Sequence, residues 1–335
     1  MNTQEHPFAQ FVRILGRGPT RSRPMTMDES EQAMTMIMAG DVTPEQLGAF
    51  LMLLRVNTET SEEIAGFVKA SKASLNMPKN IPAVDLDWSS YAGKKRQLPY
   101  FILAALTLVQ SGITIMMQGA EGHTEGRMYT GDILQELGIP SALNLQQASE
   151  QIEQTGFAYI TLENLSPELH HIIGLRPLLG LRSPIHTLGR MLNPFDAPHS
   201  VQGIFHPNYM PVHQVAAQLL EQPHMAVFRG EGGEVEVRPN KPFEVCTVHN
   251  GELGSERWPR ILPEMRHPID TEMDISRINA IWSGDDEDDY AIAAITGTMA
   301  VILTVMGKAN DQQSAHSIAN QLWQQRDKTQ PLSNK

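Results

Sequence analysis

The hydrophobic pattern of the chain changes near residue 81, and this change constrains the fold more than any other feature of the sequence. Before it, apolar residues recur at the spacing of helices that bury one face. Beyond it, short apolar runs alternate with helical segments. We expect strands at 83–86, 113–117, 158–161, 224–228, 234–238 and 243–248, and helices at 100–111, 130–137, 210–220 and 315–323. Residues 282–306 should form a turn, an acidic cap and a long apolar helix. Such alternation is typical of βα units, so it predicts a mostly parallel sheet.

The first region carries local signals for four helices. The first is an amphipathic segment whose apolar residues are Phe8, Phe11, Val12 and Leu15. Thr26 or Asp28 can cap the second helix. Thr43-Pro-Glu-Gln46 and Thr60-Ser-Glu-Glu63 each place a capping hydroxyl three residues before an amide or an acid. The fold class that we predict is therefore α/β, with a small all-α domain and a large α/β domain around a mostly parallel sheet.

Length and composition agree with a soluble protein of two domains. The chain has 335 residues, and single hydrophobic cores rarely grow beyond about 250–300 residues. We expect no membrane partner, because no apolar run reaches the roughly 20 residues of a membrane-spanning helix. The first residues lack the apolar core of a signal peptide, and Cys246 is the single cysteine, which excludes an internal disulfide. We therefore expect a cytoplasmic protein.

Basic residues gather in the stretch from 176 to 190. Arg176, Arg182, His186 and Arg190 lie six, four and four residues apart, so the last three can share one helical face. Such a group of cations can bind an anion, although separate surface residues would give the same spacing. A second basic run, Lys94-Lys95-Arg96, follows the first predicted strand.

The net charge of −12 argues against a general nucleic-acid coat, but its distribution is uneven. The run from Asp285 to Asp289 supplies five of the negative charges. Because negative charge is favourable at the start of a helix, we expect this run to cap the long apolar helix that follows it.

Two long runs carry a resemblance to a known family. The run from Glu31 to Arg55, EQAMTMIMAGDVTPEQLGAFLMLLR, and the run from Glu59 to Gly66 resemble the N-terminal helical domain of glycosyltransferase family 3, the anthranilate phosphoribosyltransferase and nucleoside phosphorylase group. The segment from Gly180 to Pro194 is similar to the family's Leu-Gly-Pro-Leu-x-Asn-Pro region. The resemblance implies a helical domain of residues 1–78, joined by helices from about 166–192, beside a large α/β domain of residues 79–335, with substrates between them.

The resemblance also shows where this chain departs from the family. The family's Gly-Thr-Gly-Gly-Asp loop, which cradles phosphate, corresponds to the segment 88–96, in which Trp88 and Tyr91 are bulky and Gly93 remains. The family's Lys-His-Gly-Asn corresponds to Met117-Gln-Gly119-Ala. We therefore interpret Gly93 and Gly119 as remnants of a donor site.

The family's metal-binding pair is also altered. Its Asp-Glu turn corresponds to the segment 230–236, where Val235 stands at the place of the aspartate and Glu236 at that of the glutamate. A lone carboxylate is a weak Mg²⁺ site, although Glu231 or Glu234 could add ligands. Ser166 replaces a family histidine and Arg190 a proline, while Arg176 matches the arginine that faces the aromatic acceptor.

These departures resemble the divergent YbiB-type branch of the family, which implies a homodimer that binds nucleic acid instead of catalysing transfer. We predict a sequence-non-specific binder of DNA or RNA that needs no cofactor and uses a basic interdomain cleft. Its anion-binding residues would be Lys94, Lys95, Arg96, Arg176, Arg182, His186 and Arg190. One alternative is an active phosphoribosyltransferase with Mg²⁺ at Glu236. A small-anion or nucleotide sensor is the other.

The apolar helices of the first region also suggest self-association. The segment 47–56, with Phe50, Met52 and Leu53, is more apolar than one buried face requires. Phe8, Phe11 and Leu15 add a further stripe. We expect this surplus to be buried between two subunits.

Overall fold

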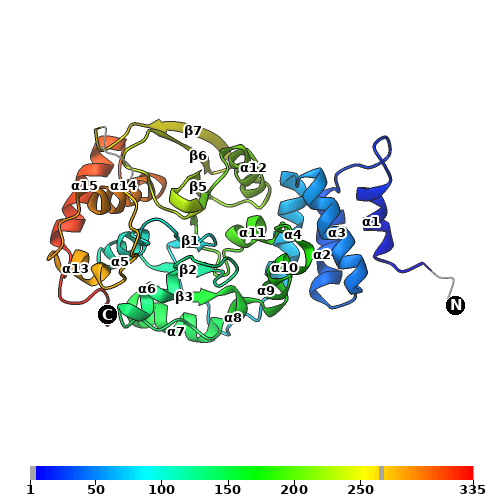
Figure 1. The fold of residues 1–335 in the computed structure, drawn as a ribbon, viewed down its shortest axis with the longest axis horizontal. Helices are drawn as coiled ribbons and strands as arrows, with labels where there is room; N and C mark the ends of the chain where they lie inside the picture. The colour runs from blue at the N-terminus through cyan, green and yellow to red at the C-terminus, as the bar shows by residue number, and fades with distance from the viewer. Residues whose placement is uncertain (1–4, 264–267, 335) are drawn as a thin grey trace.

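The computed structural model of the protein describes residues 5–263 and 268–334. Four helices come first, at the end of the molecule that carries the N-terminus in Figure 1. They are α1 (Ala9–Gly16), α2 (Met27–Met38), α3 (Pro44–Asn57) and α4 (Ser61–Ala73). The predicted caps are confirmed, because Thr26, Thr43 and Thr60 each form a capping box with the residue three positions on.

A seven-stranded sheet forms the centre of the remaining chain. Its strands are β1 (Leu86–Ser90), β2 (Ile115–Gly119), β3 (Phe157–Thr161), β4 (His199–Ile204), β5 (His224–Arg229), β6 (Phe243–His249) and β7 (Glu252–Trp258). They lie in the order β3-β2-β1-β4-β5-β6-β7. The first five are parallel, and β6 and β7 join them antiparallel. The predicted fold class is confirmed.

The other helices cover the two faces of the sheet or link it to the helical end. They are α5 (Phe101–Gln110), α6 (Thr130–Glu136), α7 (Leu145–Thr155), α8 (Leu162–Leu165), α9 (Pro167–Gly174), α10 (Arg176–Leu179), α11 (Ile185–Leu188), α12 (Met210–Leu219), α13 (Arg277–Ser283), α14 (Asp289–Val305) and α15 (Gln312–Gln325). One core lies between the sheet and α5, α14 and α15; the other lies beneath α7 and α12 and continues into α1–α4. Among the described residues, no helix is both long and apolar enough to cross a lipid bilayer.

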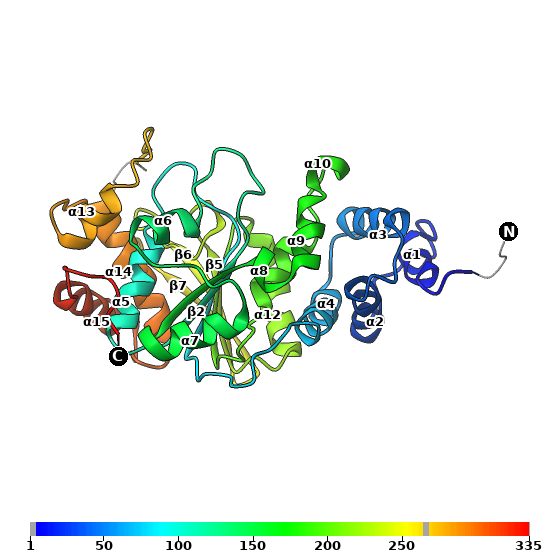
Figure 2. The same cartoon turned by 90° about the horizontal axis from the view of Figure 1, so that it is seen from below.

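The helices α9, α10 and α11 lead from the sheet back toward the first four helices, as Figures 1 and 2 show. α11 packs against α4, and the side chain of Leu179 in α10 lies next to Gly48 in α3. Arg176 is therefore held between the helical end and the sheet.

Several strand predictions were wrong. The first strand begins at Leu86 and not at residue 83, and residues 234–238 form no strand. Instead, the carboxylates of Glu234 and Glu236 bind groups that follow β1. The strands β4 and β7 were not predicted. Ser200 and Gln202 interrupt the apolar pattern of β4, and β7 is exposed along nearly its whole length at the edge of the sheet.

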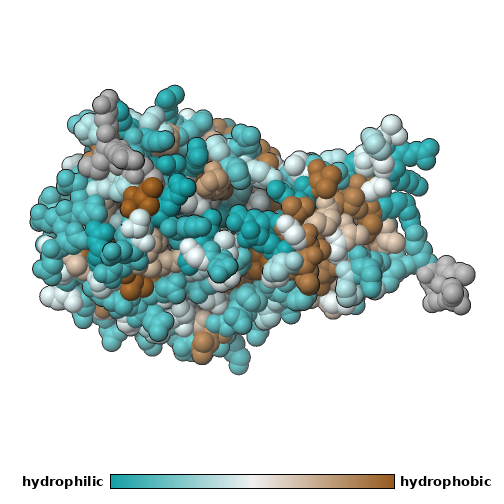
Figure 3. Space-filling model, in the orientation of Figure 1, coloured by the Kyte–Doolittle hydropathy of each residue, from teal (hydrophilic) through white to brown (hydrophobic). Residues whose placement is uncertain are grey.

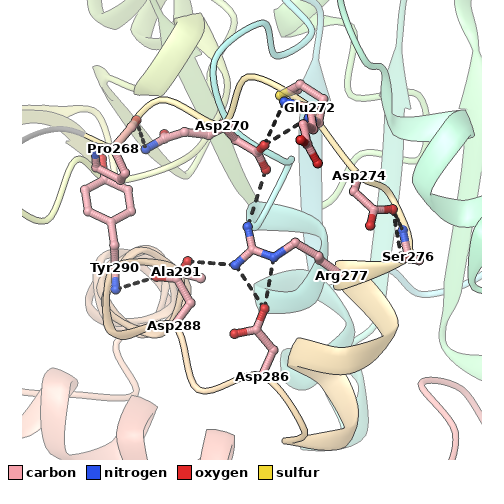
Figure 4. A network of polar contacts seen from close by, with 12 residues as sticks. Pro268, Asp270, Glu272, Asp274, Ser276, Arg277, Asp286, Asp288, Tyr290 and Ala291 are labelled. Atoms are coloured by element: carbon pink, nitrogen blue, oxygen red, sulfur yellow. Dashed lines mark hydrogen bonds and ion pairs between the residues drawn. The ribbon is translucent and has the colours of Figure 1, made fainter.

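The acidic run before α14 has the expected capping role. The side chain of Asp288 accepts hydrogen bonds from the backbone N–H groups of Tyr290 and Ala291. Figure 4 shows Arg277 between Asp270, Asp286 and Asp288, with which it forms ion pairs. This network fixes the start of α14 against the loop before α13.

Candidate anion-binding site

The loop after β1 forms a small cradle of backbone N–H groups. Gly93 has φ of +67°, a left-handed conformation that glycine adopts without strain. The N–H groups of Ala92 and Gly93 both point to one place, as in the backbone nests that bind anions in other proteins. The resemblance to the family places a phosphate-binding loop at this position.

An internal carboxylate occupies this cradle. Oε1 of Glu234 accepts hydrogen bonds from the N–H of Ala92 at 2.6 Å and from that of Gly93 at 2.5 Å. Glu234 lies in the segment after β5, and this segment crosses β4 to reach the cradle. A β carbon at Gly203 in β4 would clash with the backbone of Glu234, so glycine is required at the crossing.

A second internal carboxylate fills the neighbouring site. Glu236 forms an ion pair with Lys94, and its Oε2 accepts a hydrogen bond of 2.9 Å from the N–H of Phe101 at the start of α5. Both side chains are buried, with exposed fractions of 1% for Lys94 and 0% for Glu236. Burial raises the pKa of Glu236, and the charge of Lys94 opposes this shift. A helix start beside a lysine is a favourable place for any anion. Here that anion is the carboxylate of Glu236, from the chain itself.

These carboxylates do not fit a magnesium site as they stand. Glu234 is bound to the backbone, Glu236 to Lys94, and Glu231 forms an ion pair of 2.9 Å with Arg238. Across residues 5–263 and 268–334, no group of three or more His, Cys, Asp or Glu side chains could hold a metal ion. Mg²⁺ requires several oxygen ligands in octahedral geometry, and the buried ammonium of Lys94 takes the place that a cation would need beside Glu236.

A basic cluster lies next to the cradle. It consists of Arg176, Arg182, Arg190, His186, Arg127 and His123. Arg176 donates to Oγ1 of Thr124 at 2.9 Å, and Nη1 of Arg127 donates to the carbonyls of Ala92 and Gly93 at 2.8 and 3.0 Å. Partial burial lowers the pKa of Arg182, and the charges of Arg176 and Arg127 lower it further.

The two histidines of the basic cluster are neutral. Their rings meet edge to face with centroids 4.9 Å apart. Burial lowers the pKa of His123 to about 4 and that of His186 well below its ordinary value, and the nearby arginines add to both shifts. The positive charge of the cluster therefore comes from arginine alone.

The structure separates the predicted anion-binding residues into three groups. Arg176, Arg182, His186 and Arg190 come together as expected, although Arg190 is buried, donates to the carbonyls of His186 and Gly203, and lies over the ring of Tyr91. Lys94 points into the interior, which corrects the expectation that it lines an open surface. Lys95 and Arg96 are exposed, and the backbone carbonyl of Arg96 accepts from the N–H of Asp270.

The remaining predicted positions are structural in this arrangement. Gly119 ends β2, where the backbone of Ser90 passes so close that a side chain would clash. Ser166 caps α9 by accepting from the N–H of Leu169. Arg127 and His123 were not predicted. They lie in the loop after β2, and the tendency of ligands to bind at the carboxyl ends of parallel strands could have indicated them.

Comparisons with known proteins identify the family. Residues 9–74 match the glycosyl transferase family, helical bundle domain, and residues 102–323 match the glycosyl transferase family, a/b domain. An anthranilate phosphoribosyltransferase of Anaeromyxobacter sp. (strain Fw109-5) is 30% identical over 237 residues, which cover 70% of this chain and 69% of that protein. The enzyme of the same name from Gluconobacter oxydans (strain 621H) is 28% identical over 287 residues, or 84% of this chain and 76% of that protein.

Solved structures show the same fold. The anthranilate phosphoribosyltransferase of Thermus thermophilus superposes with a TM-score of 0.78 at 20% identity, over 95% of this chain and 94% of that one. The Saccharomyces cerevisiae enzyme in complex with PRPP and Mg gives a TM-score of 0.77 at 16% identity, over 97% and 95%. The chain therefore belongs to the glycosyl transferase family that includes the anthranilate phosphoribosyltransferases.

Proposed function

We propose that this protein is a family member whose donor site is closed by its own carboxylates, and that it binds nucleic acid without strong sequence preference as a homodimer. The observation that carries the proposal is the pair of short hydrogen bonds from Ala92 and Gly93 to Glu234. A pyrophosphate group entering this cradle would have to displace Glu234. It would also meet the negative charge of Glu236 next to the same loop.

The basic cluster supports binding of an extended anion. Among the described residues, Arg127, Arg176 and Arg182 form no ion pair with a carboxylate, and each is at least partly exposed. Lys95 and Arg96 add exposed charge in the loop after β1 itself. Several exposed cations from separate segments suit phosphates that repeat along a backbone better than one compact pyrophosphate.

The kinship with active enzymes favours a second candidate, a phosphoribosyltransferase with an aromatic acceptor. Arg176 would then face the acceptor, as the resemblance implies. For this function, Glu234 would have to leave the backbone and Glu236 would have to leave Lys94 before either could bind a metal ion. The two candidates therefore differ in what the closed cradle does during function.

Binding to nucleic acid should depend on salt. If Lys95, Arg96, Arg127, Arg176 and Arg182 each contact a phosphate, the slope of log K against log salt should be about −3.5 to −4.5, at roughly 0.7–0.9 per contact. The Arg176→Gln/Arg182→Gln variant should flatten the slope by about 1.4–1.8 without changing sequence preference. The measurement is fluorescence anisotropy of a labelled mixed-sequence oligonucleotide from low to physiological salt.

A control variant separates contacts from net charge. Arg257→Gln/Arg260→Gln removes the same charge at exposed positions in and just after the edge strand β7, and we expect it to leave the slope unchanged. Equal flattening by both double variants would contradict a role for the basic cluster. Absence of wild-type binding even at low salt would reject nucleic-acid binding and leave the small-molecule functions.

Opening the cradle should create affinity for pyrophosphate. We expect wild-type protein to show neither Mg²⁺-dependent turnover of anthranilate with PRPP nor calorimetric binding of pyrophosphate. Glu234→Ala frees the two N–H groups, so it should bind pyrophosphate, whereas Glu252→Ala on exposed β7 should not. Mg²⁺-dependent formation of phosphoribosyl anthranilate by the wild type would instead establish the enzyme.

The dimer should form through an exposed apolar stripe on α3. Phe8, Phe11 and Phe50 pack against one another inside the protomer, so they do not supply the surplus that the sequence suggested. The stripe instead consists of Ala49, Met52, Leu53 and Val56: Val56 is 75% exposed and Ala49 is exposed, whereas Met52 and Leu53 are partly buried against the core of the protomer. Figure 3 shows hydrophobic surface over this end of the molecule, around α3 and α10.

Sedimentation velocity at micromolar concentration tests the α3 stripe. We expect wild-type protein to sediment as a dimer and Val56→Asp as a monomer, because the charge would be buried without a partner. Leu143→Asp is the matched control, since Leu143 is 68% exposed in the loop before α7. A monomeric wild type would reject the dimer.

A further inference from the structure

An exposed aromatic ring stands at the carboxyl end of the sheet, beside the candidate site. Phe205 directly follows Ile204, the last residue of β4, and is 52% exposed. Its ring meets His206 edge to face, with centroids 4.9 Å apart and planes at 83°. A single exposed apolar residue is common on protein surfaces, so the importance of Phe205 depends on what lies around it.

Phe205 lies beside the cradle that the backbone N–H groups of Ala92 and Gly93 form. A β carbon at Gly233 would lie 3.3 Å from the β carbons of both Phe205 and Ala92. Phe205 therefore flanks the loop that Glu234 holds. Arg127 binds the carbonyls of Ala92 and Gly93 in that same loop. Phe205 thus begins beside Gly233, which lies between it and Ala92, and Arg127 binds the backbone of the same turn.

We propose that Phe205 is a stacking platform for an unpaired base, so that the preferred ligand is single-stranded nucleic acid. This inference rests on the proposed function and narrows its ligand class. Stacking needs the flat face of a base, which a duplex hides between neighbouring base pairs. A single strand can turn a base onto the ring while its phosphates contact Arg127 and Arg182. Such stacking is tolerant of sequence because every base has a π face.

The test uses one ring-removing and one ring-keeping substitution. Phe205→Leu keeps an apolar side chain but removes the aromatic face, and it should weaken binding of a short mixed-sequence single strand by about 5- to 150-fold. Phe205→Trp keeps the aromatic face and should retain the wild-type affinity. All four native tryptophans are buried, so the introduced indole should dominate the fluorescence change on binding.

Two further ligands separate the contribution of the base to binding from that of the phosphates. One is the duplex of the same sequence, and the other is a strand of equal length made of abasic sites. Both should bind wild type more weakly than the single strand does, and Phe205→Leu should leave both affinities unchanged. Equal thermal unfolding of wild type and Phe205→Leu checks that the half-exposed substitution leaves the fold intact.

The possible failures are distinguishable. If wild type binds single strand, duplex and abasic strand equally and Phe205→Leu changes none of them, the stacking role is wrong while nucleic-acid binding stands. If Phe205→Leu weakens the binding of all three ligands alike, the ring affects the shape of the site and the stacking role is again wrong. If wild type binds none of them at low salt, the proposed function fails and the stacking role fails with it.

Discussion

Replacing Glu236 by alanine is expected to lower the free energy of unfolding by about 3–5 kcal/mol, because it leaves a buried charge without its partner. The ammonium of Lys94 is 1% exposed and pairs with Glu236, which is 0% exposed. The same change removes the acceptor for the N–H of Phe101. Urea unfolding at pH 7 measures the effect, provided that the slope against urea is unchanged.

A double substitution tests the explanation for Glu236→Ala. Lys94→Met/Glu236→Leu removes both charges and keeps apolar volume, so it should recover most of the lost stability. Glu31→Ala breaks the ion pair between Lys69 and Glu31, whose side chains are 47% and 35% exposed, and should have a much smaller effect. If Glu236→Ala lowers the free energy of unfolding no more than Glu31→Ala does, solvent reaches Lys94 and the ion pair is not buried as described.

Replacing Asp87 by asparagine is expected to stabilise the protein at high pH and not at low pH. Asp87 lies in β1 and is fully buried, and its carboxylate oxygens are shielded from solvent. Burial raises its pKa from 3.8 to about 7, although the charge of Lys72 opposes the shift. The folded protein therefore holds a proton that the unfolded chain releases near pH 4.

The sign of the pH dependence follows from this difference. Stability is lost as the pH rises from about 4 to 7, and the loss is complete above pH 7. A shift of three pKa units corresponds to about 4 kcal/mol, so Asp87→Asn should gain about 2–4 kcal/mol at pH 8 and nothing near pH 4. Urea unfolding at pH 4, 6 and 8 measures it, with exposed Asp41→Asn as the control for a lost negative charge. Parallel pH profiles of wild type and Asp87→Asn would contradict the raised pKa.

The helical end shows how much local sequence can predict. Thr26, Thr43 and Thr60 cap their helices through residues three positions away, so the signal and its structural consequence lie in the same short segment. The acidic run before α14 is similar, because Asp288 binds the N–H groups of its immediate neighbours. In both cases the capping side chain and the backbone that it binds are adjacent in the sequence.

The strands show where the hydrophobic pattern of the sequence no longer predicts the structure. The apolar strands β2, β3 and β5 were expected close to where they form, because burial on both faces gives a continuous apolar run. Ser200 and Gln202 make β4 polar on one face, yet both side chains are buried. Residues of α4 and α12 lie over that face and line a cavity with Ser200 and Gln202, and His213 of α12 forms a hydrogen bond with Gln202, so a strand of this composition can occupy the middle of the sheet.

The sequence by itself determined the fold class, the caps and the clustering of Arg176, Arg182, His186 and Arg190, because these follow from local spacing and from the resemblance to the family. The tertiary structure decided what the charges do. Lys94 is expected at a phosphate site from its place after the first strand, but Glu236, 142 residues further on, arrives beside it. The sheet order places β4 beside β1 and β5 beside β4, so the loop after β5 can cross β4 at Gly203 and close the cradle. Electrostatic partners are set by distance in space, and no spacing along the chain encodes a contact of that range.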